Sequence, residues 1–297
     1  MSSFLASQTP AGKSLPPPVY YLAATADKRD GDHSNDVWRA RVVHDSLPNQ
    51  SLPMMVKALT SQVSMAVEIA CALAARELRL PVPLPGLVYA ERSMLLGIRP
   101  KYPGEVVLLV GSHYQRPDAL LAELLEDNPA GEELVWQRLC ETPTARQGAV
   151  LDELIANPDR HCENVLFDGV SWWLFDHDQA LAPAATFVAK SELVAARQAA
   201  IDFTAKANRL AHQLLLRHRD KHGILEQIRK VDSGSKRLHA LAQYSRHWTH
   251  PDPRINETLQ LVGVVLGLIH LRLPALAEKI NARLGNLPPT PSLWSEQ

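Results

Sequence analysis

Asp159, Asn164 and Asp176 are the residues of this 297-residue chain whose types and spacing could do chemistry. Asn164 follows Asp159 by five residues in the polar stretch DRHCEN, and Asp176 comes twelve residues later, behind the apolar runs VLF and WWLF. Phosphoryl transfer needs a carboxylate that orients the acceptor hydroxyl, and it needs hard oxygen ligands that hold Mg²⁺ against nucleotide phosphates. A catalytic Asp, a metal-binding Asn five positions later and a further Asp after the next hairpin form the pattern of kinases.

A helix and a hairpin are predicted around these residues, and both place the polar residues at their ends. The apolar spacing over 151–155 predicts a helix, which Asn157-Pro158 ends because proline disfavours a helical residue before it. The turn Asp168-Gly169 divides VLF and WWLF into a hairpin, and the second strand runs directly into Asp176. The alternative is a polar turn whose Asp and Asn side chains only cap and hydrogen-bond locally.

The stretch NPDRHCENVLF followed by WWLFDHDQAL resembles the catalytic loop and metal-binding motif of HipA-like kinases, whose DRHxxN form is shared with phosphatidylinositol kinases. The resemblance implies that Asp159 is the catalytic base, that Asn164 and Asp176 bind Mg²⁺, and that His161 braces the loop by hydrogen bonding. FDHD stands where the motif is usually DFG, so Asp178 is a rival of Asp176. We favour Asp176 because it ends the apolar strand directly.

Lys57 and Glu68 form a second candidate pair. Lys57 lies among apolar residues in the predicted strand 53–59, where a lysine is either an edge residue pointing to water or a buried cation with an anionic partner. Glu68 lies in the second turn of the predicted alanine-rich helix 64–78. A strand lysine followed by a helix glutamate positions the ATP phosphates in kinases, so we predict a Lys57–Glu68 ion pair and assign both residues to ATP binding. The following ELRLPVPLPGLV again resembles HipA-like kinases.

The other elements separate a strand-rich part from a helical part. Strands are predicted at 19–26, 37–43, 53–59, 87–98 and 106–110, and they are expected to complete an antiparallel sheet. Helices are predicted at 117–126, 132–140, 191–206, 207–218, 224–231, 236–245, 256–271 and 274–284. The stretches 232–235 and 251–253 are expected to break the helices.

We therefore expect an α+β chain with the two-lobed protein-kinase-like fold that the resemblance implies. Residues 18–112 would form a lobe with a small antiparallel β-sheet and one helix, and residues 113–287 a mostly α-helical lobe with the catalytic loop, between tails at 1–17 and 288–297. The polar loop centred on Gly31 would fold over ATP phosphates, although it lacks repeated glycines and also fits a solvated hairpin tip. Gly111-Ser112 would mark the crossing between the lobes.

Composition narrows the partners. A net charge of −1 argues against bulk DNA or an anionic membrane surface, and the three cysteines have no CxxC spacing, which fits a reducing cytosol. The N-terminus lacks the pattern of a signal peptide, and the apolar segment 259–273 is too short to span a bilayer. We predict a cytoplasmic protein with no nucleic-acid partner and no membrane insertion.

Two further clusters have less specific interpretations. His161-Cys162 and His177-Asp178 invite a zinc site, but adjacent residues cannot easily face one ion, so zinc is disfavoured. The basic run 209–222 is either a solvated helix face or a binding patch for an acidic partner.

The function we predict is ATP- and Mg²⁺-dependent transfer of a phosphoryl group to a Ser/Thr hydroxyl of an unidentified protein substrate, as in HipA-like kinases. A lipid or small-molecule kinase is the alternative among enzymes, because DRHxxN loops occur there too. A catalytically inactive nucleotide-binding or interaction module is the alternative from another class. The complete set Lys57, Glu68, Asp159, Asn164 and Asp176 argues against the inactive module.

Overall fold

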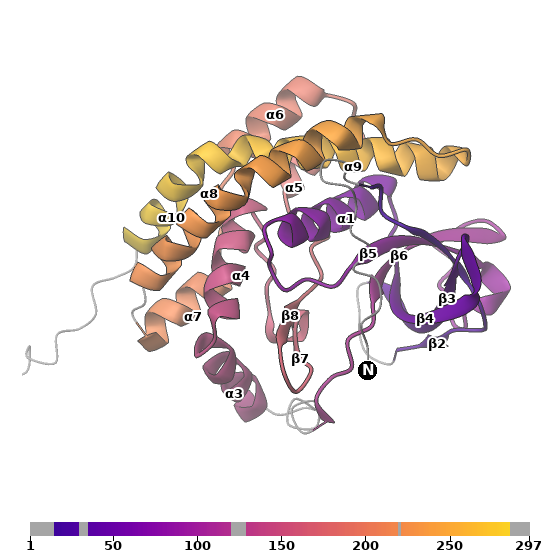
Figure 1. Cartoon of the computed structure of the whole chain (residues 1–297), viewed down its shortest axis with the longest axis horizontal. Coiled ribbons are helices and arrows are strands. Elements are labelled where there is room, and N and C mark those ends of the chain that lie inside the picture. Colours follow the sequence, from indigo (N-terminus) through magenta and orange to yellow (C-terminus); the bar gives the residue numbers. More distant parts are fainter. Residues whose placement is uncertain (1–14, 30–34, 120–128, 219–220, 286–297) are drawn as a thin grey trace, which may run out of the picture.

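The chain folds as a mixed α/β protein in which a small strand-rich part lies beside a larger set of helices (Figure 1). The computed structural model describes residues 15–29, 35–119, 129–218 and 221–285. Residues 30–34 of the predicted loop around Gly31, most of the predicted helix 117–126 and nearly all of both predicted tails lie outside the described residues.

The strands close into a five-stranded barrel rather than an open sheet. Their order is β1-β5-β6-β4-β3, and a further pairing of β1 with β3 closes the ring, while the short β2 is added to β3. The strands are β1 (Val19–Leu22), β2 (Asp27–Lys28), β3 (Asp36–His44), β4 (Leu47–Ala58), β5 (Pro85–Glu91) and β6 (Val106–His113).

The prediction of an antiparallel sheet is wrong for one pair of strands, because β1 and β5 run parallel. Parallel neighbours need a long crossover connection, and the chain between β1 and β5 supplies one that contains two long strands and a helix. The predicted strand 19–26 is also shorter than expected, and the predicted strand 87–98 ends at Glu91 in a 3₁₀ turn.

Alternation along β4 decides where Lys57 points. Met54, Val56 and Ala58 are buried in the barrel interior, together with Trp38 and Val42 of β3. Successive side chains of a strand point to opposite faces, so Lys57 points out of the barrel. It lies opposite Val37 on one side and Val110 on the other.

Gly86 allows the parallel pair to close the barrel. A Cβ at this position would lie 2.7 Å from the Tyr20 ring and 3.0 Å from the Pro18 carbonyl oxygen, which belongs to fixed backbone. We expect Gly86→Ala to lower the free energy of unfolding by about 1–3 kcal/mol, as overpacking commonly does.

Gly267, inside a long helix, is the matched control because a Cβ there meets nothing within 4 Å. Gly267→Ala should stabilise the chain by roughly 0.5–1 kcal/mol through helix propensity. Denaturant unfolding would measure the expected loss of stability in Gly86→Ala and the expected gain in Gly267→Ala. Equal stability of Gly86→Ala and the unaltered chain would mean that the barrel seam relaxes freely.

Helix α1 (Gln62–Glu77) covers the outer face of the barrel next to Lys57. Ser61 caps it, since the Ser61 hydroxyl accepts a hydrogen bond from the Ser64 backbone N–H at 3.0 Å. Its buried positions are mostly small or β-branched and pack into one continuous core with Leu87 and Val110 of the barrel. Small residues let the neighbouring helices approach α1 closely.

Eight helices of the described residues and one hairpin form the helical part of the chain. They are α3 (Pro129–Cys140), α4 (Pro143–Leu154), the hairpin β7 (Val165–Phe167) and β8 (Trp172–Leu174), α5 (Ala182–Ala189), α6 (Leu193–Asp202), α7 (Arg209–His218), α8 (Lys221–Tyr244), α9 (Pro253–Arg272) and α10 (Leu276–Gly285). The predicted hairpin after the polar loop is confirmed.

The predicted break at 232–235 is wrong, because α8 is continuous through it. Two serines donate to carbonyl oxygens three residues earlier, Ser233 to Lys230 and Ser235 to Asp232, both at 2.6 Å, so their polar groups are satisfied inside the helix. Gly234 lies against Leu78 at the end of α1, where an added Cβ would meet the Leu78 side chain at 2.9 Å. The glycine thus serves a close helix approach.

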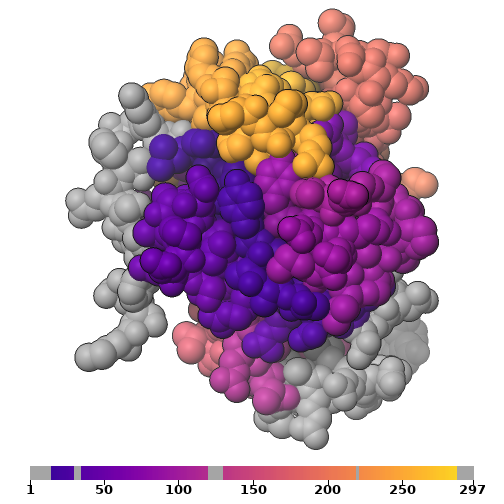
Figure 2. Space-filling model, turned by 90° about the vertical axis from the view of Figure 1, so that its right-hand side faces the viewer, coloured from indigo at the N-terminus to yellow at the C-terminus, as the bar shows by residue number. Residues whose placement is uncertain are grey.

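Helix α9 joins the helical part to the barrel. It begins three residues before the predicted start at 256, because Pro253 is its first residue and Asp252 is its cap, and it packs along α1. Arg254 donates to the Val106 carbonyl oxygen at 3.0 Å and lies over the Tyr89 ring, so the start of α9 is seated on the barrel (Figure 2). The run Pro253–Gly285 is long and apolar enough to cross a membrane by length and composition, but more than half of its apolar window is buried in the protein.

Candidate functional site

Helix α4 leads into the polar loop through a tightly bonded turn. Ala156 has a left-handed backbone with φ of 49°, and the next residue, Asn157, donates its backbone N–H to Asp152 at 2.8 Å. The buried Asn157 side chain then accepts from the backbone N–H of Asp159 at 3.1 Å. The helix end and Asn157 therefore fix the backbone of Asp159.

Arg160 ties the loop together from inside. Its guanidinium forms a bidentate pair with Asp152 of α4, with nitrogen–oxygen distances of 2.9 and 3.2 Å, and both side chains are 0% exposed. The same guanidinium donates to the backbone carbonyl oxygens of Asn164, at 3.1 Å, and of Phe175. One buried cation thus connects a helix, the polar loop and the end of β8.

Asp159 and Asn164 are bonded to each other across the loop. The Asn164 Nδ2 donates to the Asp159 backbone carbonyl oxygen at 2.8 Å, which leaves Oδ1 as the acceptor atom of that amide. The Asp159 carboxylate is half-exposed. Its nearest His161 nitrogen is 3.9 Å away, too long for a hydrogen bond, so within the described ranges Arg160 and Asn157 hold the loop rather than a bond from His161 to Asp159.

The turn after β8 carries the carboxylates of Asp176 and Asp178. The Phe175 N–H donates to the Asn164 carbonyl oxygen at 3.2 Å, which places Asp176 next to the polar loop. Asp176 has a left-handed backbone with φ of 59°, a conformation that costs a residue with a Cβ about 1–3 kcal/mol and that concentrates at functional sites. This strain is held in place by the contacts on both sides of the turn.

Lys57 reaches this turn from the barrel. Its Nζ lies 2.7 Å from Asp176 Oδ1 and 2.7 Å from Asp178 Oδ2. Burial acts to lower the pKa of Lys57, but the charges of Glu68, Asp176 and Asp178 outweigh it and raise the pKa above its ordinary value. The lysine is therefore a fixed cation, and its interpretation as an edge-strand residue pointing to water is wrong.

The predicted ion pair between Lys57 and Glu68 is wrong, because the carboxylates that Lys57 contacts belong to Asp176 and Asp178. In the described part of the chain Glu68 binds the turn itself, because its Oε2 accepts from the His177 backbone N–H at 2.6 Å and its Oε1 lies 3.5 Å from the His177 ring. Burial acts to raise the pKa of Glu68, while the His177 contact and the Lys57 charge lower it below its ordinary value. Glu68 thus positions the turn as a carboxylate and influences Lys57 through its charge.

Asp176 and Asp178 have different surroundings. Asp178 is only 6% exposed and accepts from Asn35 and from Gln179, each at 3.0 Å, in addition to its pair with Lys57. Asp176 is 34% exposed, and among the described residues its side chain contacts Lys57 alone. Asp178 is therefore largely occupied by protein donors, whereas Asp176 keeps most of its oxygen lone pairs available.

The comparisons with known proteins give little beyond this geometry. No protein-family model matches the sequence, and no curated protein matches it either. Among solved structures, the chain is similar to a proinflammatory kinase, CtkA, of Helicobacter pylori, with a TM-score of 0.44 and 12% identity over 90% of this chain and 98% of that chain. A likeness this low decides neither fold nor function.

Three residues of the site were not singled out from the sequence. Arg160 stands inside the DRH motif, and its buried partner Asp152 lies on the helix just before it, so an acidic residue on an apolar helix face was the available signal. Asn35, which donates to Asp178, comes from the polar stretch before β3 and had no such signal.

Proposed function

We propose that this chain is an ATP- and Mg²⁺-dependent kinase that transfers the γ-phosphoryl group to a Ser/Thr hydroxyl of a protein. One observation carries the proposal: Lys57 from the barrel, the turn Asp176–Asp178 and the loop 159–164 meet at one place, although they are far apart in the sequence. We further propose that the barrel part, up to about residue 112, and the helical part are the two lobes of a protein-kinase-like fold, and that the protein is cytoplasmic.

The donor atoms fit a magnesium ion and nucleotide phosphates. Asn164 Oδ1 and the open Asp176 carboxylate are hard oxygen ligands of the kind Mg²⁺ prefers. Bound Mg²⁺ supplies neutralisation of the phosphate charge during transfer. Lys57 is already held as a cation beside these oxygens, so it can exchange a carboxylate partner for a phosphate oxygen.

Asp159 is the group suited to accept the proton of the acceptor hydroxyl. Its carboxylate is half-exposed, so an acceptor can approach it, while Asn157 and Asn164 fix its backbone on both sides. Glu68 is a positioning residue in this scheme, because it holds the metal-binding turn through the His177 backbone.

The test of the proposal is thermal stability in the presence of ATP and Mg²⁺, separately and together. A ligand at a hundredfold excess over its Kd stabilises the folded state by about 2.7 kcal/mol. We expect ATP with Mg²⁺ to raise the Tm by several degrees and either alone to raise it much less, because Mg²⁺ is seldom held by protein ligands alone.

Asp176→Asn should abolish this synergy, since it removes the open carboxylate and Asn tolerates the left-handed backbone. Asp178→Asn is the matched control, which should lower the starting Tm because its contacts are buried, yet retain the synergy. The reverse result would make Asp178 the metal ligand. Equal stabilisation by ATP with and without Mg²⁺ would indicate a nucleotide-binding module and contradict the kinase.

The acceptor is the finer part of the proposal. Incubation with γ-labelled ATP, first alone and then with candidate lipids and a cell lysate, distinguishes a protein acceptor from a lipid. Label in lipid alone would favour the lipid or small-molecule kinase, which would use the same Asp159, Asn164 and Asp176.

A further inference from the structure

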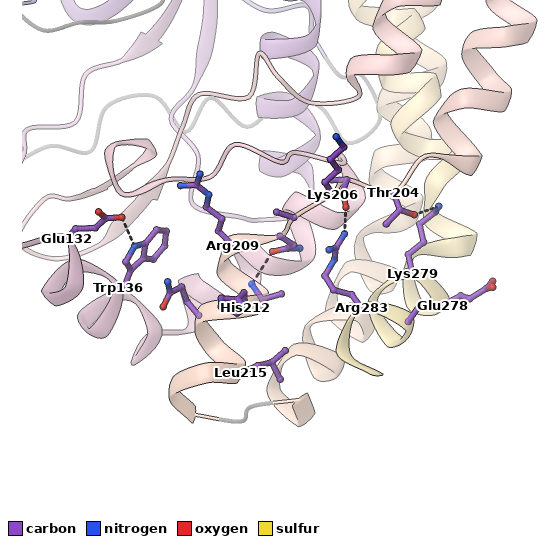
Figure 3. Close-up of a pocket in the computed structure, with 16 residues that line it drawn as sticks. Glu132, Trp136, Thr204, Lys206, Arg209, His212, Leu215, Glu278, Lys279 and Arg283 are labelled. Carbon is purple, nitrogen blue, oxygen red and sulfur yellow. Dashed lines mark hydrogen bonds between the residues drawn. The ribbon is translucent and has the colours of Figure 1, made fainter. Parts of the chain in front are cut away.

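A groove of about 910 Å³ lies in the helical part, away from Lys57. Its walls come from α3, from the segment 204–208, from α7 and from α10 (Figure 3). Glu132 and Trp136 stand at one end and α10 at the other, with Arg209 and His212 between them. The start of α7 belongs to the basic run noted in the sequence, which the phosphoryl-transfer site does not use.

The groove offers more available cations than carboxylates. Lys206 and Arg209 are exposed, and in the described part of the chain no ion pair joins either of them to a carboxylate. Lys279 contacts only oxygens without charge, including Thr204 Oγ1 at 3.2 Å and the Phe203 carbonyl at 3.3 Å. Arg283 is neutralised by the buried Glu153 behind the groove.

Two carboxylates line the groove, and within the described ranges neither forms an ion pair with these cations. Glu278 points away from Lys206 and Arg209 (Figure 3), although its charge and that of Asp202 act on Lys279. Glu132 accepts from the Trp136 indole N–H at 3.2 Å. An excess of positive charge therefore remains along the rim formed by Lys206, Arg209 and Lys279.

Hydrogen bonds of Asn208 hold the segment that carries Lys206 and Arg209 in place. Asn208 between them is buried, and its Nδ2 donates to the Ala149 carbonyl oxygen of α4 at 2.7 Å. Its Oδ1 accepts from the Ala211 backbone N–H at 3.0 Å, which caps α7. The two cations are thus placed by backbone that is anchored to the helix leading into the polar loop.

One end of the groove adjoins that loop. Glu132 lies on α3, the helix that forms this end of the groove wall. Cys162 lies three residues after Asp159, and α3 packs against the 3₁₀ turn Cys162–Asn164. An extended chain lying in the groove would therefore pass close to the loop that carries Asp159.

We propose that this groove binds an acidic segment of the protein acceptor and so guides its hydroxyl toward Asp159; this rests on the proposed kinase function. The cations stand on an exposed rim, where they attract and orient an acidic chain without a large desolvation cost. The segment would hold several carboxylates, matching the spread of Lys206, Arg209 and Lys279.

The experiment measures binding of two fluorescent peptides to the full chain by anisotropy. One contains a single serine among Asp and Glu residues, and its partner has Lys and Arg in their places. We expect the acidic peptide to bind more tightly and to weaken as salt is added. Lys206→Glu with Arg209→Glu should weaken binding about tenfold, which is 1.4 kcal/mol for two reversed surface charges.

The matched control is Arg229→Glu with Lys236→Glu, which changes the net charge equally on exposed α8 residues outside the groove. It should leave binding within about twofold, because exposed charges farther than a Debye length are screened. Equal effects of the two double variants on binding of the acidic peptide, or tighter binding of the basic peptide, would contradict the proposal that the groove binds an acidic segment. So would labelled oligouridylate RNA that binds more tightly than the acidic peptide and loses binding in the groove variant.

Asp159→Asn separates this proposal from the kinase proposal, because it should bind the acidic peptide as well as the unaltered chain does. If the unaltered chain shows no ATP–Mg²⁺ synergy but its peptide binding still depends on Lys206 and Arg209, the kinase proposal is rejected and the groove proposal stands. If the unaltered chain shows the synergy but the groove variant binds the peptide normally, the groove proposal is rejected and the kinase proposal stands.

Discussion

Asp159→Asn is expected to lower the rate of phosphoryl transfer by about 10²- to 10⁴-fold, the usual contribution of a general base, and to leave the Tm nearly unchanged. Asparagine has the same shape but cannot take up the hydroxyl proton. The side chain is half-exposed, and the bonds that hold this position use the Asp159 backbone N–H and carbonyl oxygen, which the substitution keeps. Single-turnover transfer from labelled ATP and a thermal melt measure the two quantities.

Glu163→Gln is the control for this variant, since it neutralises a carboxylate of the same loop that is 72% exposed. It should retain both the rate and the Tm. Retained activity in Asp159→Asn would remove Asp159 from the role of base. A large fall in its Tm would instead support a polar turn with only local hydrogen bonding.

Asp152→Asn is expected to cost about 3–5 kcal/mol of stability, because it leaves the Arg160 guanidinium charged and without its partner in a dry interior. Both side chains are 0% exposed, so solvent screens neither charge. Denaturant unfolding at constant pH measures the loss. Asp152→Leu combined with Arg160→Met should cost clearly less than the sum of the two single substitutions, since the uncompensated charge disappears.

The pair of Glu133 with Arg217 is the control for burial. It is also bidentate, through Nη1 and Nη2 of Arg217 at 2.6 and 2.7 Å, but the Glu133 side chain is 63% exposed. Glu133→Gln should leave the stability nearly unchanged, as exposed ion pairs usually do. Equal losses for Asp152→Asn and Glu133→Gln would show that the Arg160 cluster does not depend on its burial.

The local parts of the site could be predicted from the sequence because their signals are local. Asn157-Pro158 ends α4, and Asp168-Gly169 forms the hairpin turn, where the Asp168 side chain accepts from the Val170 and Ser171 backbone N–H groups. The five-residue spacing from Asp159 to Asn164 reflects a single loop closed by one hydrogen bond.

Partners across the fold could not be predicted in the same way. Lys57 is separated from Asp176 by 119 residues, and its pairing with Asp176 and Asp178 forms only when the barrel and the turn after β8 come together. The parallel pairing of β1 with β5 likewise follows from barrel closure, which no short pattern encodes. Gly234 was interpreted as a break because its neighbour Leu78 is far away in the sequence.

The packing of α9 against α1 has a consequence for the order in which the protein can be completed. Glu68 holds the turn Asp176–Asp178 from α1. Helix α1 ends at Glu77 and packs against α9, which begins 176 residues later at Pro253. A chain in which α9 has not yet been translated therefore already contains Lys57, the loop 159–164 and the turn Asp176–Asp178. It lacks the helix surface against which α1 packs. We therefore expect Glu68 and the turn that it holds to reach their final positions only after α9 has been translated.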